Sequence, residues 1–281
     1  MANSFLEKKD FKFNTRVLLY TKIFMEFTKL YQSVKNLLSK EPPQIEIFVR
    51  HCHFSNVSSH KKRPEGFSRE KCHLNLMATL ENEKNVNVTF FLDTFYPMEK
   101  RHFILDQNNY PVIQIKEGNE GGSFCKMLDH VLSRSFSSDT IIYFLEDDYL
   151  HRPDWVSVMR EGIAIPEIDY LTLYDHRDKY FHPNYKGLKS ELFLTESTHW
   201  RVTPSTTNTY AMKFKTLKRD QDLHFAFSKD KKISEDHAKF CALSDKGSKL
   251  ISPIPGWSCH MEPEFASPCI DWQAVQEFSV N

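Results

Sequence analysis

Short apolar segments alternate with longer amphipathic segments along most of the chain. The short segments are rich in β-branched and aromatic residues, which is typical of buried strands. In the first half of the chain they lie at 45–50, 86–92, 111–115 and 141–145. The longer segments between them carry apolar residues at three- and four-residue steps, as amphipathic helices do. This alternation predicts an α/β fold, with a mostly parallel, Rossmann-type sheet flanked by helices.

Local signals place several helix starts. Ser68 is expected to cap a helix that runs to about residue 82, with Leu74, Met77 and Leu80 facing inward. A second helix follows the polar segment 118–123, and a third begins at Pro153, where proline is tolerated.

The second half of the chain is less regular. A strand is expected at 170–174, and two strands are expected in 191–213 around the threonine-rich loop 203–209. Ser234 is expected to cap a further helix, which precedes a last strand at 250–254. The helix should bury Ala238, Phe240, Cys241 and Leu243.

An apolar stripe at 15–39 is the clearest signal of a long helix in the chain. Residues 16–40 hold five basic residues and one acidic residue. The helix is therefore expected either to pack on the main domain or to make a peripheral membrane or dimer contact. The predicted organisation is an N-terminal helical extension at 1–43, a main domain at 44–262 and a tail at 263–281, which Trp272 is expected to dock.

Three consecutive acids, Glu146, Asp147 and Asp148, follow the apolar segment 141–145. Unpaired carboxylates are costly to bury, so these acids are expected at the carboxyl edge of the sheet, where α/β proteins bind ligands. If the strand continued, Glu146 and Asp148 would share one face and Asp147 would point away. Clustered carboxylate oxygens favour a divalent cation, and a solvated acidic turn is the alternative.

Composition narrows the function. Lysine plus arginine and aspartate plus glutamate each total 37, so no basic field recruits nucleic acid and none is expected as a partner. The chain has only 8 glycines and neither G-x-x-x-x-G-K-[ST] nor G-x-G-x-x-G, which excludes the common phosphate-binding loops.

The six cysteines form no C-x-x-C pair and are expected to be reduced thiols. Cys52-His53 and Cys72-His73 leave a zinc site as an alternative, although their spacing lacks a paired knuckle. No apolar window reaches the ~18 residues needed to cross a bilayer, and the first ten residues hold no apolar signal core. A cytoplasmic protein is therefore expected.

Four features follow in a set order: the acid-tipped strand, a polar loop, an acid pair that opens a helix, and a late histidine. Over roughly residues 44–262 this order resembles the GT-A class of nucleotide-sugar glycosyltransferases. Glu146-Asp147-Asp148 resembles the D-x-D-type motif of that class, in the variant with glutamate first. The resemblance implies a GT-A-like fold in which Asp148 binds the metal and Glu146, with Asp147 beside it, contacts the nucleotide sugar.

Further residues are assigned by the same resemblance. Ser234-Glu235-Asp236 resembles the xED motif, which implies Asp236 as the general base and Glu235 as the second choice. His260 resembles the late metal-binding histidine, and Asn119-Glu120-Gly121-Gly122 resembles a turn near the nucleotide.

Other assignments rest on position alone. Asp93, at the end of the second strand, is expected either to contact the nucleotide base or to cap the strand. His176 and His199-Trp200 are candidates for an acceptor site, because aromatic rings stack on sugars. The threonine-rich loop departs from the resemblance, since the class often has a glycine-containing loop there.

The resemblance implies a metal-dependent, inverting glycosyltransferase. It would use Mn²⁺ or Mg²⁺ to move a sugar from a nucleoside-diphosphate sugar to a hydroxyl of a glycan or glycoprotein acceptor. A likeness to enzymes of bacteria and large algal viruses favours a UDP-sugar, with UDP-xylose as one candidate. Two rival hypotheses are a two-metal phosphoryl-transfer enzyme and a non-catalytic module that binds a sugar or a partner.

Overall fold

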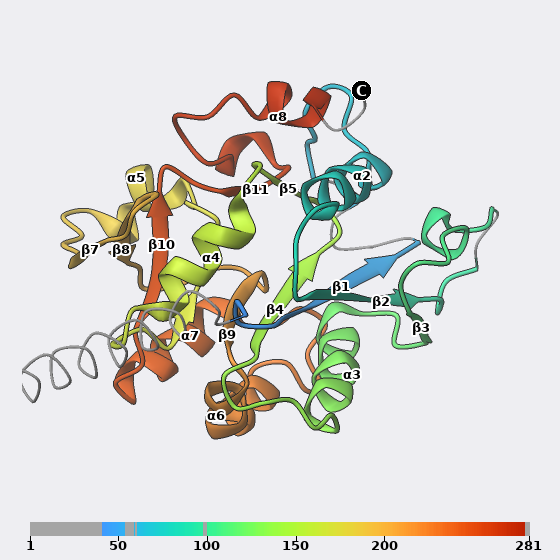
Figure 1. Ribbon diagram of the computed structural model, residues 1–281, viewed down its shortest axis with the longest axis horizontal. Helices are drawn as coiled ribbons and strands as arrows, with labels where there is room; N and C mark the ends of the chain where they lie inside the picture. The colour runs from blue at the N-terminus through green and yellow to red at the C-terminus, as the bar shows by residue number, and fades with distance from the viewer. Residues whose placement is uncertain (1–40, 54–58, 60, 98–99, 279–281) are drawn as a thin grey trace, which may run out of the picture. The chain divides into compact units, whose positions relative to one another are not determined.

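A nine-stranded sheet lies at the centre of the protein, in the order β3-β2-β1-β4-β9-β6-β10-β8-β7 (Figure 1). The computed structural model describes residues 41–53, 59, 61–97 and 100–278. The predicted helix at 15–39 lies outside these residues, and the unit described below begins at Pro42. The strands of this sheet are β1 (Ile45–Cys52), β2 (Val86–Asp93), β3 (Val112–Ile115), β4 (Ile141–Glu146), β6 (Tyr170–Leu171), β7 (Leu192–Leu194), β8 (His199–Val202), β9 (Tyr210–Lys213) and β10 (Leu250–Ile254).

Most strands of the sheet run in the same direction. β1 pairs in parallel with β2 and β4, β2 with β3, and β6 with β10. β8 and β9 run antiparallel to each of their neighbours. The prediction of an α/β fold with a mostly parallel sheet is therefore confirmed.

Helices cover both faces of the sheet, and Figure 1 shows α2 and α3 on opposite sides of β1, β2 and β4. Along β4, Ile141, Tyr143 and Leu145 belong to one core cluster, with residues of α2 and α4, whereas Ile142 and Phe144 belong to another, with residues of α3, α6 and α7. Side chains alternate along a strand, so one apolar segment supplies both cores. The helices are α2 (Arg69–Leu80), α3 (Glu120–Leu132), α4 (Trp155–Ala164), α5 (Asp178–Phe181), α6 (Phe214–Ala226), α7 (Asp236–Asp245) and α8 (Trp272–Phe278).

Of the two serines predicted to cap helices, Ser68 does so and Ser234 does not. The Ser68 side chain accepts a hydrogen bond from the Lys71 backbone N–H and caps α2, as predicted. Leu74, predicted to face inward, is 43% exposed. Ser234 was wrongly predicted as a cap, because α7 begins one residue later and Glu235 holds the cap position.

The second half of the chain differs in detail from the prediction. The segment 191–213 contains three strands, β7 to β9, instead of two. The strand expected at 170–174 is reduced to β6, and Tyr174 makes only an isolated bridge to Ser258.

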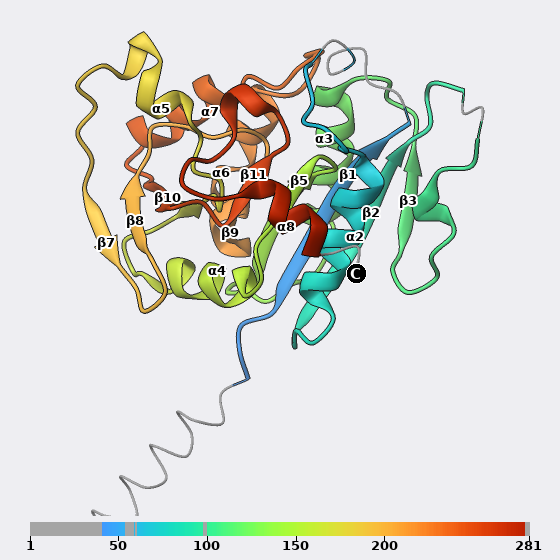
Figure 2. The ribbon, with the colours of Figure 1, turned by 90° about the horizontal axis from the view of Figure 1, so that it is seen from above.

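Beyond the main sheet, β5 (Tyr149–His151) pairs antiparallel with β11 (Ser258–His260). The C-terminal segment packs over this ribbon, and Figure 2 shows α8 beside α2. Trp272 is buried there in one cluster with Cys72 and Leu150 of the main domain, which confirms its predicted docking role. Short 3₁₀ segments complete the fold: η1 (Phe103–Leu105), η2 (Pro183–Tyr185) and η3 (Pro263–Phe265). Within the described residues, no helix is both long enough and apolar enough to cross a membrane.

Candidate functional site

The three consecutive acids lie at the carboxyl end of β4, and each faces a different neighbour. β4 ends at Glu146, and Asp147 and Asp148 form the turn into β5. Because the chain turns here, strand alternation no longer sets the directions of Asp147 and Asp148. The ribbon of β5 and β11 pairs Tyr149 with His260, which brings that histidine next to Asp148.

Glu146 forms an ion pair across the parallel strands. Arg50 is its register partner on β1, and the Arg50 Nη2–Glu146 Oε1 distance is 2.9 Å. Burial raises the pKa of Glu146; Arg50 opposes this rise, whereas Glu120 and Asp236 add to it. Four charged groups from separate segments are therefore close enough to act on one another.

The Asp147 side chain faces α2, whereas the Glu146 side chain faces β1. Its carboxylate accepts from Arg69 Nε at 2.9 Å and from the Cys52 backbone N–H at 3.4 Å, and it lies 3.7 Å from His51 Nδ1. Burial raises its pKa, and Arg69 opposes that rise. These contacts tie the turn to β1 and α2.

Asp148 lies between an arginine and a histidine. Its Oδ2 is 2.7 Å from Arg63 Nη2 and 3.1 Å from His260 Nε2. Burial alone would raise the pKa of Asp148, but His260 and Arg63 lower it well below the usual range. Asp148 is therefore held as a carboxylate.

The predicted metal ligands, Asp148 and His260, are adjacent. Their side chains form a hydrogen bond of 3.1 Å between His260 Nε2 and Asp148 Oδ2, and carboxylate and imidazole are both ligand types that Mn²⁺ accepts. Glu262 lies 3.5 Å from His260 Nδ1, on the other side of the ring, an arrangement common at metal-binding histidines. Among the described residues no group of three or more His, Cys, Asp and Glu side chains is arranged to hold a metal. Asp148 and His260 suit an ion whose other ligands are phosphate and water oxygens. Binding of such an ion requires the Arg63 side chain to move away from Asp148.

Asp236 begins α7 and is held by a buried lysine. Lys239 Nζ is 3.0 Å from Asp236 Oδ1 and 2.7 Å from Asn208 Oδ1, and the lysine is 0% exposed. Its ammonium group lies 4.9 Å from the centre of the Phe124 ring and 4.8 Å from that of Tyr210. Burial raises the pKa of Asp236 to about 6, while Lys239 limits the rise.

Glu235, the second predicted base, has a different environment. Its side chain is 48% exposed and pairs with Lys231 at 2.9 Å. Exposed i, i+4 pairs of this kind contribute little to stability. Of the two adjacent acids, only Asp236 joins the buried network.

Glu120, at the start of α3, connects the strand tip to α7. Its Oε1 accepts from Asn208 Nδ2 at 3.2 Å and from the Ser234 backbone N–H at 3.3 Å. Its carbonyl oxygen accepts from Arg50 Nη1 at 3.2 Å. A continuous set of hydrogen bonds therefore runs from the Arg50–Glu146 pair through Glu120 and Asn208 to Lys239 and Asp236.

Asp93 organises a loop at the end of β2. It accepts from the backbone N–H groups of Phe95 and Gly118 at 3.0 and 2.8 Å and from Ser123 Oγ at 2.6 Å. These bonds correspond to the strand-capping alternative. Its predicted contact with a nucleotide base has no counterpart in them.

Gly121 and Gly122 lie in the first turn of α3, where Asn119 is the cap. A Cβ atom on Gly121 would lie 2.4 Å from the carbonyl oxygens of Ser228 and Lys231. At Gly122 the nearest atom would be 3.1 Å away, on a side chain. Gly121 is thus required for close packing of α3 on the segment before α7.

Several residues of this network were not predicted from the sequence. Arg50 had a usable signal, because it directly follows an apolar segment in the sequence, just as Glu146 does. Lys239 had none, since a lysine three residues after an acid on a helix is ordinarily a surface pair. Asn208 was also not predicted, nor were Arg63 and Arg69, which pair with Asp148 and Asp147 beside the network.

The predicted acceptor residues separate. His176 and Asp236 line the same hollow. Trp200 is 0% exposed, packs in the core cluster next to α4 and offers no surface for a sugar. The prediction of His199-Trp200 as an acceptor surface is therefore wrong for Trp200.

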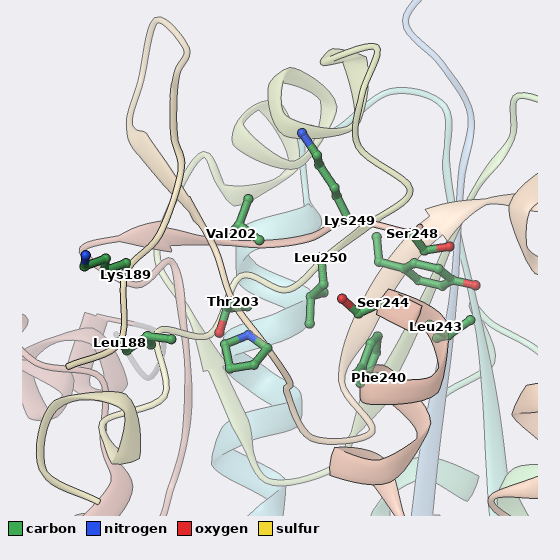
Figure 3. Close-up of a pocket in the computed structure, with 12 residues that line it drawn as sticks. Leu188, Lys189, Val202, Thr203, Phe240, Leu243, Ser244, Ser248, Lys249 and Leu250 are labelled. Carbon is green, nitrogen blue, oxygen red and sulfur yellow. The ribbon is translucent and has the colours of Figure 1, made fainter. Parts of the chain in front are cut away.

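A hollow of about 230 Å³ lies toward the C-terminal end of α7. Figure 3 shows Phe240 and Ser244 of α7 facing Thr203 and Leu250 across it. Its described lining includes none of the predicted site residues and no acid. This hollow is separate from the network around Asp236.

No protein-family model matches the sequence, and no curated protein matches it. Similar solved structures include S. aureus TarS (residues 1–349), with 12% identity and a TM-score of 0.44 over 74% of this chain and 57% of that one, so less than two thirds of that structure is spanned. CMP:2-keto-3-deoxy-manno-octonic acid synthetase in complex with CTP has 13% identity and a TM-score of 0.46, over 84% and 98% of the two chains. The 4-diphosphocytidyl-2C-methyl-D-erythritol synthase of Anaerococcus prevotii has 8% identity and a TM-score of 0.41, over 85% and 97%. These similarities are too remote to assign a function, which must come from the geometry of the site.

Proposed function

We propose that this protein is a metal-dependent, inverting glycosyltransferase. It transfers a sugar from a nucleoside-diphosphate sugar to a hydroxyl group of a glycan or glycoprotein. The favoured donor is a UDP-sugar, with UDP-xylose as one candidate. The observation that carries this proposal is the continuous network that joins the acid-tipped β4 to Asp236 through Arg50, Glu120 and Lys239.

Two kinds of group lie at the two ends of this network. The end at β4 holds the Asp148–His260 pair, with Arg50 and Arg63 as nearby positive charges suited to a diphosphate. The end at α7 holds Asp236, a carboxylate with a pKa of about 6, suited to accept a proton near neutral pH. Transfer of a sugar from a diphosphate to a hydroxyl needs both positive charge at the departing diphosphate and a base at the hydroxyl.

The roles of the residues follow from their environments. Asp236 would accept the proton of the attacking hydroxyl, while Lys239 and Asn208 fix the orientation of its carboxylate. Arg50 would hold Glu146 in position toward the donor. A single displacement with such a base inverts the anomeric carbon.

Asp148 and His260 would hold Mn²⁺ or Mg²⁺. A bound ion of this kind neutralises the charge that develops on the departing diphosphate. Asp148 is suited to this because its carboxylate stays ionised, and Mn²⁺ also accepts an imidazole ligand.

The rival two-metal phosphoryl-transfer mechanism needs several free carboxylates around two ions. Here each acid at the tip of β4 is paired with an arginine: Glu146 with Arg50, Asp147 with Arg69 and Asp148 with Arg63. This pairing favours a site for one ion over a site for two.

The metal assignment is tested by release of UDP from UDP-sugars with Mn²⁺. In Asp148→Asn we expect turnover to fall about 100-fold or more, because the ion loses its charged ligand. Asp139→Asn, at an exposed acid paired with Lys215, is the matched control and should leave turnover unchanged. Undiminished turnover of Asp148→Asn in saturating EDTA would contradict the proposal.

The donor is tested separately by thermal unfolding in the presence of UDP- and GDP-sugars with Mn²⁺. A ligand that binds only the folded state at 100 times its Kd stabilises that state by about 2.7 kcal/mol. We expect UDP-sugars to raise the unfolding temperature more than GDP-sugars do. A larger effect of GDP-sugars would overturn the choice of UDP but not that of a sugar nucleotide.

A further inference from the structure

Residues 205–207 of the threonine-rich loop, which have no role in the function proposed above, form one wall of a second hollow. This hollow has a volume of about 290 Å³ and is lined by Ser205, Thr206 and Thr207 of the loop. Residues of the segment 176–185, which holds α5 and η2, form another part of the lining, and Asp236 and His237 at the start of α7 form the rest. The carboxylate that we assign as the base therefore lines a hollow of its own.

The charges in this hollow cancel. Lys179 is the only lysine or arginine among the described lining residues, and its Nζ lies 2.9 and 3.1 Å from the two carboxylate oxygens of Asp178. The negative charge of Asp236 is balanced by Lys239, which does not line the hollow. An anionic group such as a phosphate would find no unpaired lysine or arginine here, so the hollow suits a neutral ligand.

The remaining lining groups both donate and accept hydrogen bonds. Ser205 Oγ lies 3.0 Å from His237 Nδ1 and 3.2 Å from the Tyr185 hydroxyl. Thr206 is buried, and its hydroxyl has no hydrogen-bond partner among the described residues. A buried hydroxyl without a partner costs stability, so a ligand that supplies a partner is favoured. Hydroxyl and imidazole groups together match the hydroxyls of a sugar ring.

The size of the hollow also limits the ligand. Small-molecule sites typically have volumes of about 300–1,000 Å³, and this hollow is at the lower end of that range. It therefore has room for about one sugar ring, with the remainder of a longer acceptor outside.

We propose that this hollow is the acceptor site, and that it binds an uncharged, polyhydroxylated group of about one sugar ring with a hydroxyl directed at Asp236. This inference rests on the glycosyltransferase function proposed above, because it places the acceptor on the side of Asp236 that is not occupied by Lys239. The threonine-rich loop then serves the acceptor and not the donor diphosphate.

The test is a ligand-observed NMR titration of the full-length protein with methyl glycosides of glucose, galactose, mannose and xylose, and with glucose 6-phosphate. We expect at least one neutral glycoside to bind and glucose 6-phosphate to bind more weakly. Thr206→Val keeps the shape of the side chain and should weaken glycoside binding about threefold to tenfold, the value of one hydrogen bond. His237→Ala, at an exposed residue, should have a similar effect, whereas Asp139→Asn, at an exposed acid outside the lining of the hollow, should have none.

Three results would overturn the inference: no binding of any of the four glycosides, tighter binding of glucose 6-phosphate, or unchanged binding in both variants. UDP release from UDP-sugars, measured in parallel, separates this inference from the proposed function. Donor turnover without glycoside binding would remove the acceptor site and leave the function. Glycoside binding without turnover of any sugar nucleotide would leave a sugar-binding hollow and remove the function.

Discussion

Asp236 and Lys239 show how a single pair of residues sets the chemistry of this site. An isolated buried carboxylate would have a strongly raised pKa and would be protonated at neutral pH. Here a buried ammonium group 3.0 Å away holds the pKa of Asp236 at about 6. The pair thus keeps a desolvated carboxylate ionised at neutral pH, and a carboxylate of this kind is an effective base.

The pH dependence of turnover follows from this pair. Because a base must be unprotonated, kcat/KM should fall as the pH drops below about 6, the pKa of Asp236. Lys239→Met removes the positive charge that lowers this pKa, so the acidic limb of the profile should move to higher pH by roughly one unit or more. Profiles of the two proteins with coincident acidic limbs would show that Lys239 does not act through Asp236.

At the scale of the elements, the start of α3 is fixed by packing. Gly121 allows the first turn of α3 to approach the backbone of the segment before α7, and the side chain of Glu120 then reaches Asn208. The two helices that carry the network are therefore positioned by one close contact. A role of Gly121 in nucleotide binding is not needed to explain why the residue is glycine.

The packing role predicts a stability effect. A Cβ at position 121 would lie 2.4 Å from two backbone carbonyl oxygens, so Gly121→Ala should lower the free energy of unfolding by about 1–3 kcal/mol. Gly122→Ala, whose nearest contact is a side chain at 3.1 Å, is the matched control and should cost less. Urea denaturation measures both, and equal losses in the two variants would contradict this explanation.

In the first half of the chain, the strands and helices were largely predictable from the sequence, whereas the partners of charged residues were not. The strand that ends at Glu146 and the helix capped by Ser68 follow from local patterns that the physical chemistry of one segment decides. By contrast, the Arg63–Asp148 pair joins residues that are 85 positions apart, and only the fold brings them together. The prediction that Leu74 faces inward is wrong for a related reason. Periodicity identifies the apolar face of a helix, but it does not show how far neighbouring elements cover that face.

At the scale of the whole molecule, the sheet explains why the site lies where it does. β1 and β4 are adjacent and parallel, so Arg50 and Glu146 emerge together at one edge, beyond two apolar layers that are both covered by helices. The same cores bury several histidines without charge. Burial lowers the pKa values of His151 and His224 to about 3.

These histidines predict acid sensitivity. The unfolded chain takes up protons at histidine below pH 6.5, whereas the folded protein does so only near pH 3, so stability is complete above pH 6.5 and declines as the pH falls from there. Each such histidine should cost about 1.4 kcal/mol between neutral pH and pH 5.5. Urea unfolding at both pH values measures this. His151→Asn should reduce the pH dependence, and the exposed control His199→Asn should not; equal slopes in the two variants would contradict the assignment.

The central claim is that Asp236 is the base of a sugar transfer, and the most direct test is the transfer rate of Asp236→Asn beside that of Glu235→Gln. With a UDP-sugar, Mn²⁺ and an accepted glycoside, we expect Asp236→Asn to lose about 10²–10⁴-fold in kcat. The exposed Glu235→Gln should stay within about twofold of the unmodified protein, since exposed pairs contribute little. Near-normal transfer by Asp236→Asn, or a larger loss in Glu235→Gln, would contradict the account.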